Sequence, residues 1–529
     1  MSGAPAIPAP GAGERRAAAR GVAWSGVEAA ASACVALLMT PLVLRTCGIE
    51  GLGMWGAAWS VAHTAGLLDL GVGSAYGRFA AQALARGDHR DLNATLAVGV
   101  GFQGGVSLLI LTLAAFFGPA LLDRILPPAE RPAASGFVLG ATLLTVLLRG
   151  TFSAYRGVVA GAQRLDLLAR IGAVGSIGEG MLSATLLLLG YGLRGPAIAA
   201  VVGAISVTLM EAVAAHRLCA GLAVRPFQAS REHYARVLVF GGQVQVTRAF
   251  EVLGGHAPRL ILVAGPGLAA AGAYEIAARL GGLAGTAASL PLKVLMPLAG
   301  HLEVRADVRR LRDLLARSTR YVTLLALPAV ISLLLFPDLL VLAWTGRAAP
   351  AGTVATARLV VLAVAAMIVV SPLRLLLRAG GRAGLEAAAT AAGALVQLAA
   401  AAALARRLGA PGVGLATFAG SLVALGLVAL GGRRSRSVTL TTVDAARAAA
   451  PPLVAGLGAL LAGLLWTLLL PAPIAAGRAD AFAALFVRLL PSGLVFAGLA
   501  WWGRAACSDD MLLLRDAVRR PAASTRGTS

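Results

Sequence analysis

The chain has 529 residues, of which 58% are hydrophobic and only 13% are charged. Because a soluble domain carries about 25% charged residues, this composition excludes one or two ordinary soluble domains, and the high hydrophobicity excludes intrinsic disorder. The 46 basic and 24 acidic residues give a formal net charge of +22, which in a membrane protein indicates basic cytoplasmic loops.

Long apolar stretches recur along the whole chain. The first, residues 22–44, is too long for the core of a signal peptide, so we expect an uncleaved first span. Fourteen stretches can each supply the roughly 20 residues that a transmembrane helix needs. They are centred on 22–44, 51–75, 95–118, 133–155, 171–191, 195–216, 237–258, 268–298, 321–343, 352–373, 384–405, 411–430, 449–470 and 481–503.

The distribution of arginine gives these spans an orientation. With the N-terminus inside, 31 arginines fall in inside segments and nine in outside segments. Cytoplasmic loops are the positively charged ones, so the count favours an even number of spans with both termini in the cytoplasm. The outside connections are short, and residues 121–132 form the longest one, which leaves no room for a soluble domain.

A short motif recurs in the two halves of the chain. Arg86, Asp88, Arg90 and Leu92 reappear 219 residues later as Arg305, Asp307, Arg309 and Leu311. Both copies follow an even-numbered span, and six spans separate them, which predicts two six-span halves in parallel orientation. The expected organisation is a cytoplasmic tail (1–20), a six-helix bundle (21–217), a cytoplasmic linker (218–236), a second six-helix bundle (237–431), two additional helices (432–503) and a cytoplasmic tail (504–529).

Several motifs resemble a known family in their order, spacing and span context. Residues 44–55 (LRTCGIEGLGMW) and 67–75 (LLDLGVGSA), followed by Arg78 and Gly87-Asp88, are similar to signatures of bacterial polysaccharide flippases. In the second half, residues 272–280 (GAYEIAARL) and 295–298 (LMPL) are similar to further elements of that family. The chain therefore resembles the Wzx-type oligosaccharide flippases of the multidrug/oligosaccharidyl-lipid/polysaccharide exporter superfamily.

This resemblance implies a fold and a substrate. The expected fold is an all-α polytopic membrane protein of about 14 transmembrane helices, with two six-helix bundles around a central cavity and two C-terminal helices. The expected substrate is an undecaprenyl-diphosphate-linked oligosaccharide, moved across the bacterial cytoplasmic membrane. One departure is visible: where the family often places an acidic residue, this chain reads His256-Ala257-Pro258-Arg259, which removes support for a cation or proton role there.

Twelve ionisable residues fall within the predicted spans. Each costs roughly 2.5–3.5 kcal/mol at the bilayer centre, so most must face water or pair with one another. They are Glu28, Asp69, Arg149, Glu179, Glu211, Arg248, Glu251, Glu275, Arg279, Lys293, Arg358 and Arg488. The spacing of Arg248 with Glu251 and of Glu275 with Arg279 puts each pair on one helix face.

The chemistry of the expected substrate divides these charges into roles. Guanidinium groups bind phosphate oxygens bidentately and stay charged when buried. We therefore expect the diphosphate to contact Arg149, Arg248, Arg279 and Lys293. We expect charge balance, or coupling to protons or sodium, at Glu28, Asp69, Glu251 and Glu275, since a buried carboxylate can take up a proton. A packing role is the open alternative for both pairs and for Asp69, and packing or interface roles are expected for Glu179, Glu211, Arg358 and Arg488.

The sequence gives little support to a catalytic or cofactor site. The four cysteines, Cys34, Cys47, Cys219 and Cys507, are too far apart for a metal motif. Phosphate-binding loops, HExxH and GxSxG motifs are absent, so we expect neither an enzyme nor a cofactor. The alternatives left open are a multidrug exporter, a lipid II flippase of the same superfamily, and a multi-span polysaccharide polymerase or ligase; a polymerase is also a possible partner.

Overall fold

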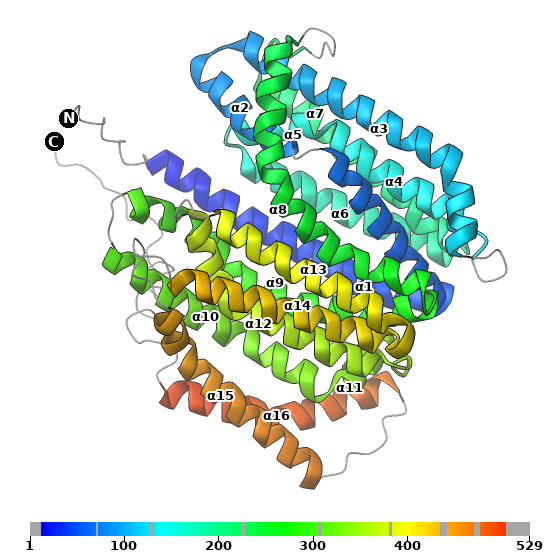
Figure 1. The fold of residues 1–529 in the computed structure, drawn as a ribbon, viewed down its shortest axis with the longest axis vertical. Coiled ribbons are helices and arrows are strands. Elements are labelled where there is room, and N and C mark those ends of the chain that lie inside the picture. Colours follow the sequence, from blue (N-terminus) through cyan, green and yellow to red (C-terminus); the bar gives the residue numbers. More distant parts are fainter. Residues whose placement is uncertain are drawn as a thin grey trace. The chain divides into compact units, whose positions relative to one another are not determined.

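The structure is a computed structural model, and it describes residues 12–69, 72–126, 132–223, 229–304, 308–379, 383–433, 442–469 and 477–503. These residues form sixteen α-helices and one short 3-10 helix, η1, without any strand among them (Figure 1). The helices are α1 (Ala12–Ala65), η1 (Gly66–Asp69), α2 (Val72–Arg86), α3 (His89–Ile125), α4 (Ser135–Thr151), α5 (Ser153–Gly161), α6 (Leu165–Leu188), α7 (Arg194–Leu218), α8 (Arg231–Ala264), α9 (Leu268–Val304), α10 (Val308–Leu335), α11 (Pro337–Thr345), α12 (Thr353–Ala379), α13 (Ala383–Leu408), α14 (Ala410–Arg433), α15 (Thr442–Leu469) and α16 (Arg478–Trp502).

The helices account for every predicted span. Each of the fourteen predicted stretches coincides with one helix or with two consecutive ones. Eleven helical segments of the described residues are long and apolar enough to cross a membrane, and Ala23–Ala65, which holds the first two predicted spans, counts as one of them. The predicted all-α polytopic membrane fold is confirmed.

By packing, the chain divides into two units. Unit 1 comprises Met1–Arg279, Ala349–Val360 and Ala387–Ala424, and unit 2 comprises Leu280–Ala348, Val361–Glu386 and Leu425–Ser529. Helices α9, α12, α13 and α14 contribute residues to both units. The predicted boundaries at 217, 236 and 431 stay a prediction.

In unit 1, α1 consists of two helical arms joined at Gly48. The φ of Gly48 is 74°, in a region that L-residues avoid and glycine tolerates, so the kink falls at this residue. Gly267, which lies 219 residues later and precedes α9, also has a positive φ, 100°. The sequence offset that separates the two Arg-Asp motifs therefore also separates two equivalent turns.

The second arm of α1 crosses the start of α9 at a glycine on each helix. A Cβ on Gly53 would overlap the carbonyl oxygen of Leu268, and a Cβ on Gly272 would overlap the carbonyl oxygen of Ile49. Residues 53 and 272, like 49 and 268, are 219 apart, so the two contacts exchange equivalent positions, as at a two-fold axis. Both glycines are needed because the two backbones touch.

The first arm of α1 packs in parallel with α6. The hydroxyl groups of Ser32 and Ser176 are 2.9 Å apart, and further along both helices Gly180 packs on Val35. Helices α6 and α7 instead run antiparallel, since Gly175 meets Val207 while Gly203 meets Glu179. These directions agree with spans one and five crossing alike and span six returning.

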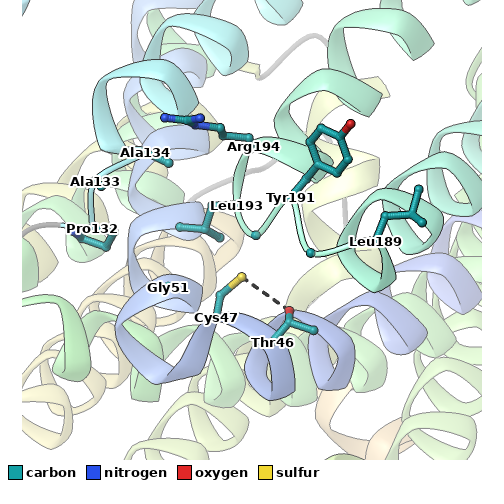
Figure 2. Close-up of a pocket in the computed structure, with 12 residues that line it drawn as sticks. Thr46, Cys47, Gly51, Pro132, Ala133, Ala134, Leu189, Tyr191, Leu193 and Arg194 are labelled. Atoms are coloured by element: carbon teal, nitrogen blue, oxygen red, sulfur yellow. Dashed lines mark hydrogen bonds between the residues drawn. The ribbon is translucent and has the colours of Figure 1, made fainter.

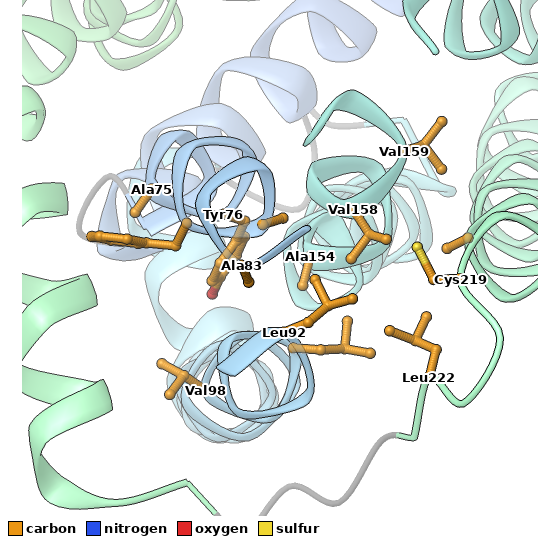
Figure 3. Packing of buried hydrophobic residues seen from close by; sticks show 14 of the residues in the cluster. Ala75, Tyr76, Ala83, Leu92, Val98, Ala154, Val158, Val159, Cys219 and Leu222 are labelled. Carbon is orange, nitrogen blue, oxygen red and sulfur yellow. The ribbon is translucent and has the colours of Figure 1, made fainter. Parts of the chain in front are cut away.

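A compact apolar cluster joins α2, α3, α5 and the end of α7 (Figure 3). Tyr76 on α2 lies at its centre and is 1% exposed. Gly157 of α5 faces the Tyr76 backbone, and Gly161 faces Ala80 one turn further on. The missing side chains let α2 and α5 approach closely.

In unit 2, α15 packs against α10 and α16, and α11 packs against α16 (Figure 1). The Arg478 side chain donates a hydrogen bond from Nη2 to the Trp344 carbonyl oxygen at 3.0 Å, which ties the start of α16 to the end of α11. Large apolar side chains on α15 and α16 stay exposed, with Leu468 at 81% and Trp501 at 85%. Such apolar faces fit contact with lipid.

Two predicted spans are each divided between two helices. The fourth, 133–155, breaks at Phe152 between α4 and α5, and the ninth, 321–343, breaks at Phe336 between α10 and α11. Pro337 is the first residue of α11. Because proline lacks a backbone N–H, it is favoured at the first position of a new helix, and the continuous apolar pattern hides this break.

Candidate functional site

The most buried charges of unit 1 form a cluster of two arginines around one carboxylate. Arg259 Nε lies 2.5 Å from Glu275 Oε2, and Arg279 Nε lies 2.7 Å from Glu275 Oε1. The Glu275 side chain is only 7% exposed. We call these three residues the cationic cluster, because two guanidinium charges meet one carboxylate charge.

The cationic cluster is fixed by the backbone of α1. Arg279 Nη1 donates to Thr40 Oγ1 at 2.6 Å and to the Ala36 carbonyl oxygen at 3.2 Å. A Cβ on Gly56 would come within 3.1 Å of Glu275 Oε2. Thr40 and Gly56 lie on the two arms of α1, within a candidate membrane span, so the cluster lies beside the membrane-spanning part of the chain.

A row of aromatic rings lies next to the cationic cluster. Trp55, Trp59 and His63 follow one another at intervals of four residues, with ring centroids 5.8 Å and 5.4 Å apart. His63 then stacks on His256 of α8, with centroids 4.6 Å apart and planes 9° from parallel. Arg259 follows His256 by three residues on the same face of α8, so the row ends one helical turn from the cationic cluster.

A second charged group joins α1, α4, α5, α6 and α7. Arg149 Nη2 donates to Glu179 Oε2 at 3.0 Å, and Arg156 Nη1 donates to Glu211 Oε1 at 3.1 Å. The Glu28 carboxylate lies within electrostatic reach of Glu211. Three carboxylates thus face two guanidinium groups, and we call these five residues the acidic group.

A third group of charges lies at the α2–α3 turn and the start of α8. Asp91 Oδ1 accepts a hydrogen bond from Arg236 Nη2 at 2.5 Å, and Asp91 Oδ2 accepts one from Arg86 Nη2 at 2.8 Å. Asp88 caps α3, and the backbone amides of Asp91 and Arg90 lower the pKa of the Asp88 carboxyl. This group ties α8 to the predicted cytoplasmic side of α2 and α3.

A pocket of about 580 Å³ opens where α1 kinks, between the α3–α4 and α6–α7 connections (Figure 2). Thr46 and Cys47 line one wall, and Tyr191 and Arg194 line another. Among the described residues around it, Arg194 supplies the only charge. The pocket lacks the paired guanidinium groups expected for a diphosphate.

The predicted site residues fall into several places. Arg279 and Glu275 belong to the cationic cluster, while Arg149 and Glu28 belong to the acidic group. Arg248 and Glu251 lie on α8, where both side chains are exposed.

Two further predicted residues cannot be placed by their side chains. Asp69 ends η1, so its turn-like position is confirmed, but its side chain lies outside the described residues. The Lys293 side chain also lies outside the described residues.

Comparison with known proteins gives a family and a fold. Residues 102–348 match the family described as polysaccharide biosynthesis protein. The lipid II flippase MurJ, in an inward closed conformation, superposes with a TM-score of 0.68 over 94% of this chain and 99% of its own, at 13% identity. An inward-facing MATE family multidrug resistance transporter of the MOP superfamily gives 0.63 over 79% and 98%, at 15% identity. The chain has the fold of the MOP superfamily.

Further matches agree with this assignment. A MOP superfamily transporter from Pyrococcus furiosus superposes with a TM-score of 0.54 over 81% of this chain and 96% of its own, at 16% identity. A comparison with curated protein sequences gives no match. The predicted resemblance to the Wzx-type flippases is confirmed by the family match and the fold together, and the chain is a membrane protein with a transporter fold.

Within this MOP fold, Arg259 is the residue that sequence reasoning missed. The orientation of the spans put it in an outside connection, but it lies in α8, and its side chain is 16% exposed. Pro258 suggested the end of a span, yet α8 continues to Ala264. The signal that could have found Arg259 is its place where the flippase family often has an acid, because a reversed charge there needs a carboxylate nearby.

Proposed function

We propose that this protein is a flippase that moves an undecaprenyl-diphosphate-linked oligosaccharide from the inner to the outer leaflet of the bacterial cytoplasmic membrane, by alternating access. The observation that carries the proposal is the cationic cluster, together with the match to a polysaccharide biosynthesis family. The chain acts as a transporter and not as an enzyme, and the lipid-linked sugar serves surface polysaccharide such as O-antigen.

The cationic cluster suits a diphosphate headgroup. Its two guanidinium groups and single carboxylate leave one positive charge beside the membrane-spanning part of α1. Planar guanidinium forks pair bidentately with phosphate oxygens, and Arg279 already directs Nη1 toward oxygen atoms of α1. A bound diphosphate exchanges these contacts for its own oxygens, while Glu275 keeps the two arginines together when the site is empty.

The acidic group suits coupling to protons or sodium. Three carboxylates against two guanidinium groups give an excess of one negative charge. Within the described residues, Glu28 has no ion pair. We assign the coupling role to Glu28, as the sequence predicted, and a charge-balancing role to Arg149.

A lipid II flippase is the second candidate. The MurJ structure covers 94% of this chain, while the MATE structure leaves about a fifth of it without a counterpart. Lipid II also carries a diphosphate and a sugar, so both candidates use the cationic cluster alike. A multidrug exporter for cationic drugs fits the positive cluster less well, and a polymerase is assigned the role of a partner.

Deletion of the gene tests the transported substrate. We expect lipid-linked oligosaccharide to accumulate in the inner leaflet of spheroplasts, with loss of surface polysaccharide and continued cell-wall synthesis. Arrest of cell-wall synthesis with lipid II in the inner leaflet supports the second candidate. Accumulation in the outer leaflet indicates a polymerase or ligase, and unchanged pools contradict the flippase proposal.

Variants of the cationic cluster test the site. Arg259→Gln and Arg279→Gln are expected to lower the rate of translocation about ten- to a hundredfold, because each removes charge-assisted hydrogen bonds worth about 1.5–3 kcal/mol. Arg279→Lys keeps the charge and should retain part of the rate. The control is Arg164→Gln, which removes an exposed pair with Asp166 at the start of α6. Full transport by both Gln variants at normal membrane levels would exclude these arginines.

A further inference from the structure

We propose that the row formed by Trp55, Trp59, His63 and His256 is the surface on which the sugar part of the substrate stacks. The inference rests on the proposed function, and it adds the carbohydrate subsite to a diphosphate subsite. It starts from the ring geometry of the second arm of α1 and of α8.

The row lies on one face of α1 and is open on that face. Trp55, Trp59 and His63 are four residues apart, so they line up along the helix over roughly 12 Å. On the next face, Met54, Ala58 and Ala62 are fully buried. His63 is exposed and both tryptophans are half-buried, so the aromatic face is not part of the packed interior.

The open face is wet. His63 lies within a candidate membrane span, and an ionisable side chain exposed at that depth faces a water-filled space more readily than lipid. His63 Nδ1 donates to the Trp59 carbonyl oxygen at 2.8 Å. In the neutral ring this leaves Nε2 as a hydrogen-bond acceptor, which suits a sugar hydroxyl group.

Polar atoms beside the row lack partners. Within the part of the chain that the structure describes, His256 Nδ1 and Gln245 Oε1 are buried without a hydrogen bond. Eleven residues separate them, close to three helical turns, so they lie on one face of α8. The Gln245 amide nitrogen donates to the Leu67 carbonyl oxygen. Buried polar atoms are normally satisfied, and a ligand rich in hydroxyl groups would satisfy these.

Aromatic rings beside unmatched polar atoms are complementary to a carbohydrate. A sugar ring presents C–H bonds on its face and hydroxyl groups on its edge. The electron-rich faces of indole rings attract the C–H bonds, and the nitrogen and amide groups of α8 are suited to the hydroxyl groups. A purely apolar tail would leave those polar atoms unsatisfied, so the row does not suit the prenyl chain.

The order of the two subsites matches the order of groups in the substrate. The row ends at His256, and Arg259 of the cationic cluster follows one turn later on α8. In a lipid-linked sugar the diphosphate is bonded directly to the first sugar ring. A diphosphate on Arg259 and Arg279 therefore brings that first ring to the aromatic row.

Binding to the full-length protein in lipid nanodiscs tests the proposal. The probes are farnesyl diphosphate and the same diphosphate bearing N-acetylglucosamine or galactose. In the wild type, at least one sugar should strengthen binding about three- to tenfold over farnesyl diphosphate, since aromatic contacts of this kind contribute about 0.5–1.5 kcal/mol. Trp59→Ala should remove this gain and leave farnesyl diphosphate binding unchanged, while Trp59→Phe should keep most of it.

Two controls separate the possible failures. Trp501→Ala changes an exposed tryptophan of unit 2 and should keep the whole gain. Farnesyl diphosphate binding that is retained in Trp59→Ala shows that this variant is folded. If neither sugar strengthens binding in the wild type, or if Trp59→Ala keeps the gain, the sugar surface is wrong while the flippase proposal stands. If no probe binds the wild type, the diphosphate site proposed above fails as well.

Discussion

At the scale of single residues, Glu275 holds the densest set of interactions in the candidate site. Its two carboxylate oxygens bind different arginines, and its side chain packs against Gly56 of α1. Removing one partner from a buried ion pair leaves an uncompensated charge. Glu275 therefore acts on the stability of the protein and on the placement of both guanidinium groups.

Glu275→Gln should destabilise the protein more than Glu179→Gln. The first variant leaves two largely buried arginines without a carboxylate, at a cost of about 3–5 kcal/mol. Glu179 pairs with one arginine that is 46% exposed, and exposed pairs contribute about 0–1 kcal/mol. Thermal unfolding in detergent, followed by intrinsic fluorescence, measures the difference. Equal shifts of the melting temperature for the two variants would show that Glu275 is not a structural centre.

The same residues show what a sequence reveals about a site. Glu275 and Arg279 are four apart on one helix, so their contact could be predicted from spacing alone. Arg259 lies sixteen residues from Glu275, across the turn between α8 and α9. Its contact depends on how the two helices fold back on each other, which no local pattern encodes.

At the scale of helices, glycines set the closest contact of the candidate site. Gly53 and Gly272 let the backbones of α1 and α9 touch, and Gly48 and Gly267 form the turns that precede these segments. Sequence spacing predicted the helices and an offset of 219 residues. The contact itself required the structure, because glycine is also frequent in membrane helices for general reasons.

Gly53→Ala and Gly272→Ala should each destabilise the protein by about 1–3 kcal/mol, as overpacking does. Both changes force apart the same crossing, so the double variant should cost less than the sum of the two. Gly178→Ala on α6 is the control, since its Cβ would meet no atom within 4 Å, and it should stay within about 0.5 kcal/mol. Chemical unfolding of the three single variants and the double variant measures these costs. Strict additivity would argue against a shared crossing.

At the scale of the whole molecule, the charges outside the helices carry the orientation. The hydrophobic pattern alone predicted an all-α membrane protein, because each span must satisfy its backbone within a helix. It placed breaks poorly, as at Phe336, because a kinked or divided span stays apolar throughout. The orientation of the spans rests on the arginine count, since hydropathy does not distinguish one side of the membrane from the other.

The orientation can be tested across α6, a helix of 24 residues that spans about 36 Å. Gln163 precedes α6 and Tyr191 follows it, and both side chains are exposed. In a background with the four native cysteines replaced by serine, Tyr191→Cys should react with an impermeant maleimide in intact spheroplasts. Gln163→Cys should react only after the membrane is permeabilised, because the arginine count places it in the cytoplasm. The reverse labelling would invert every loop, placing Asp91 and its partners outside and the pocket beside Tyr191 inside.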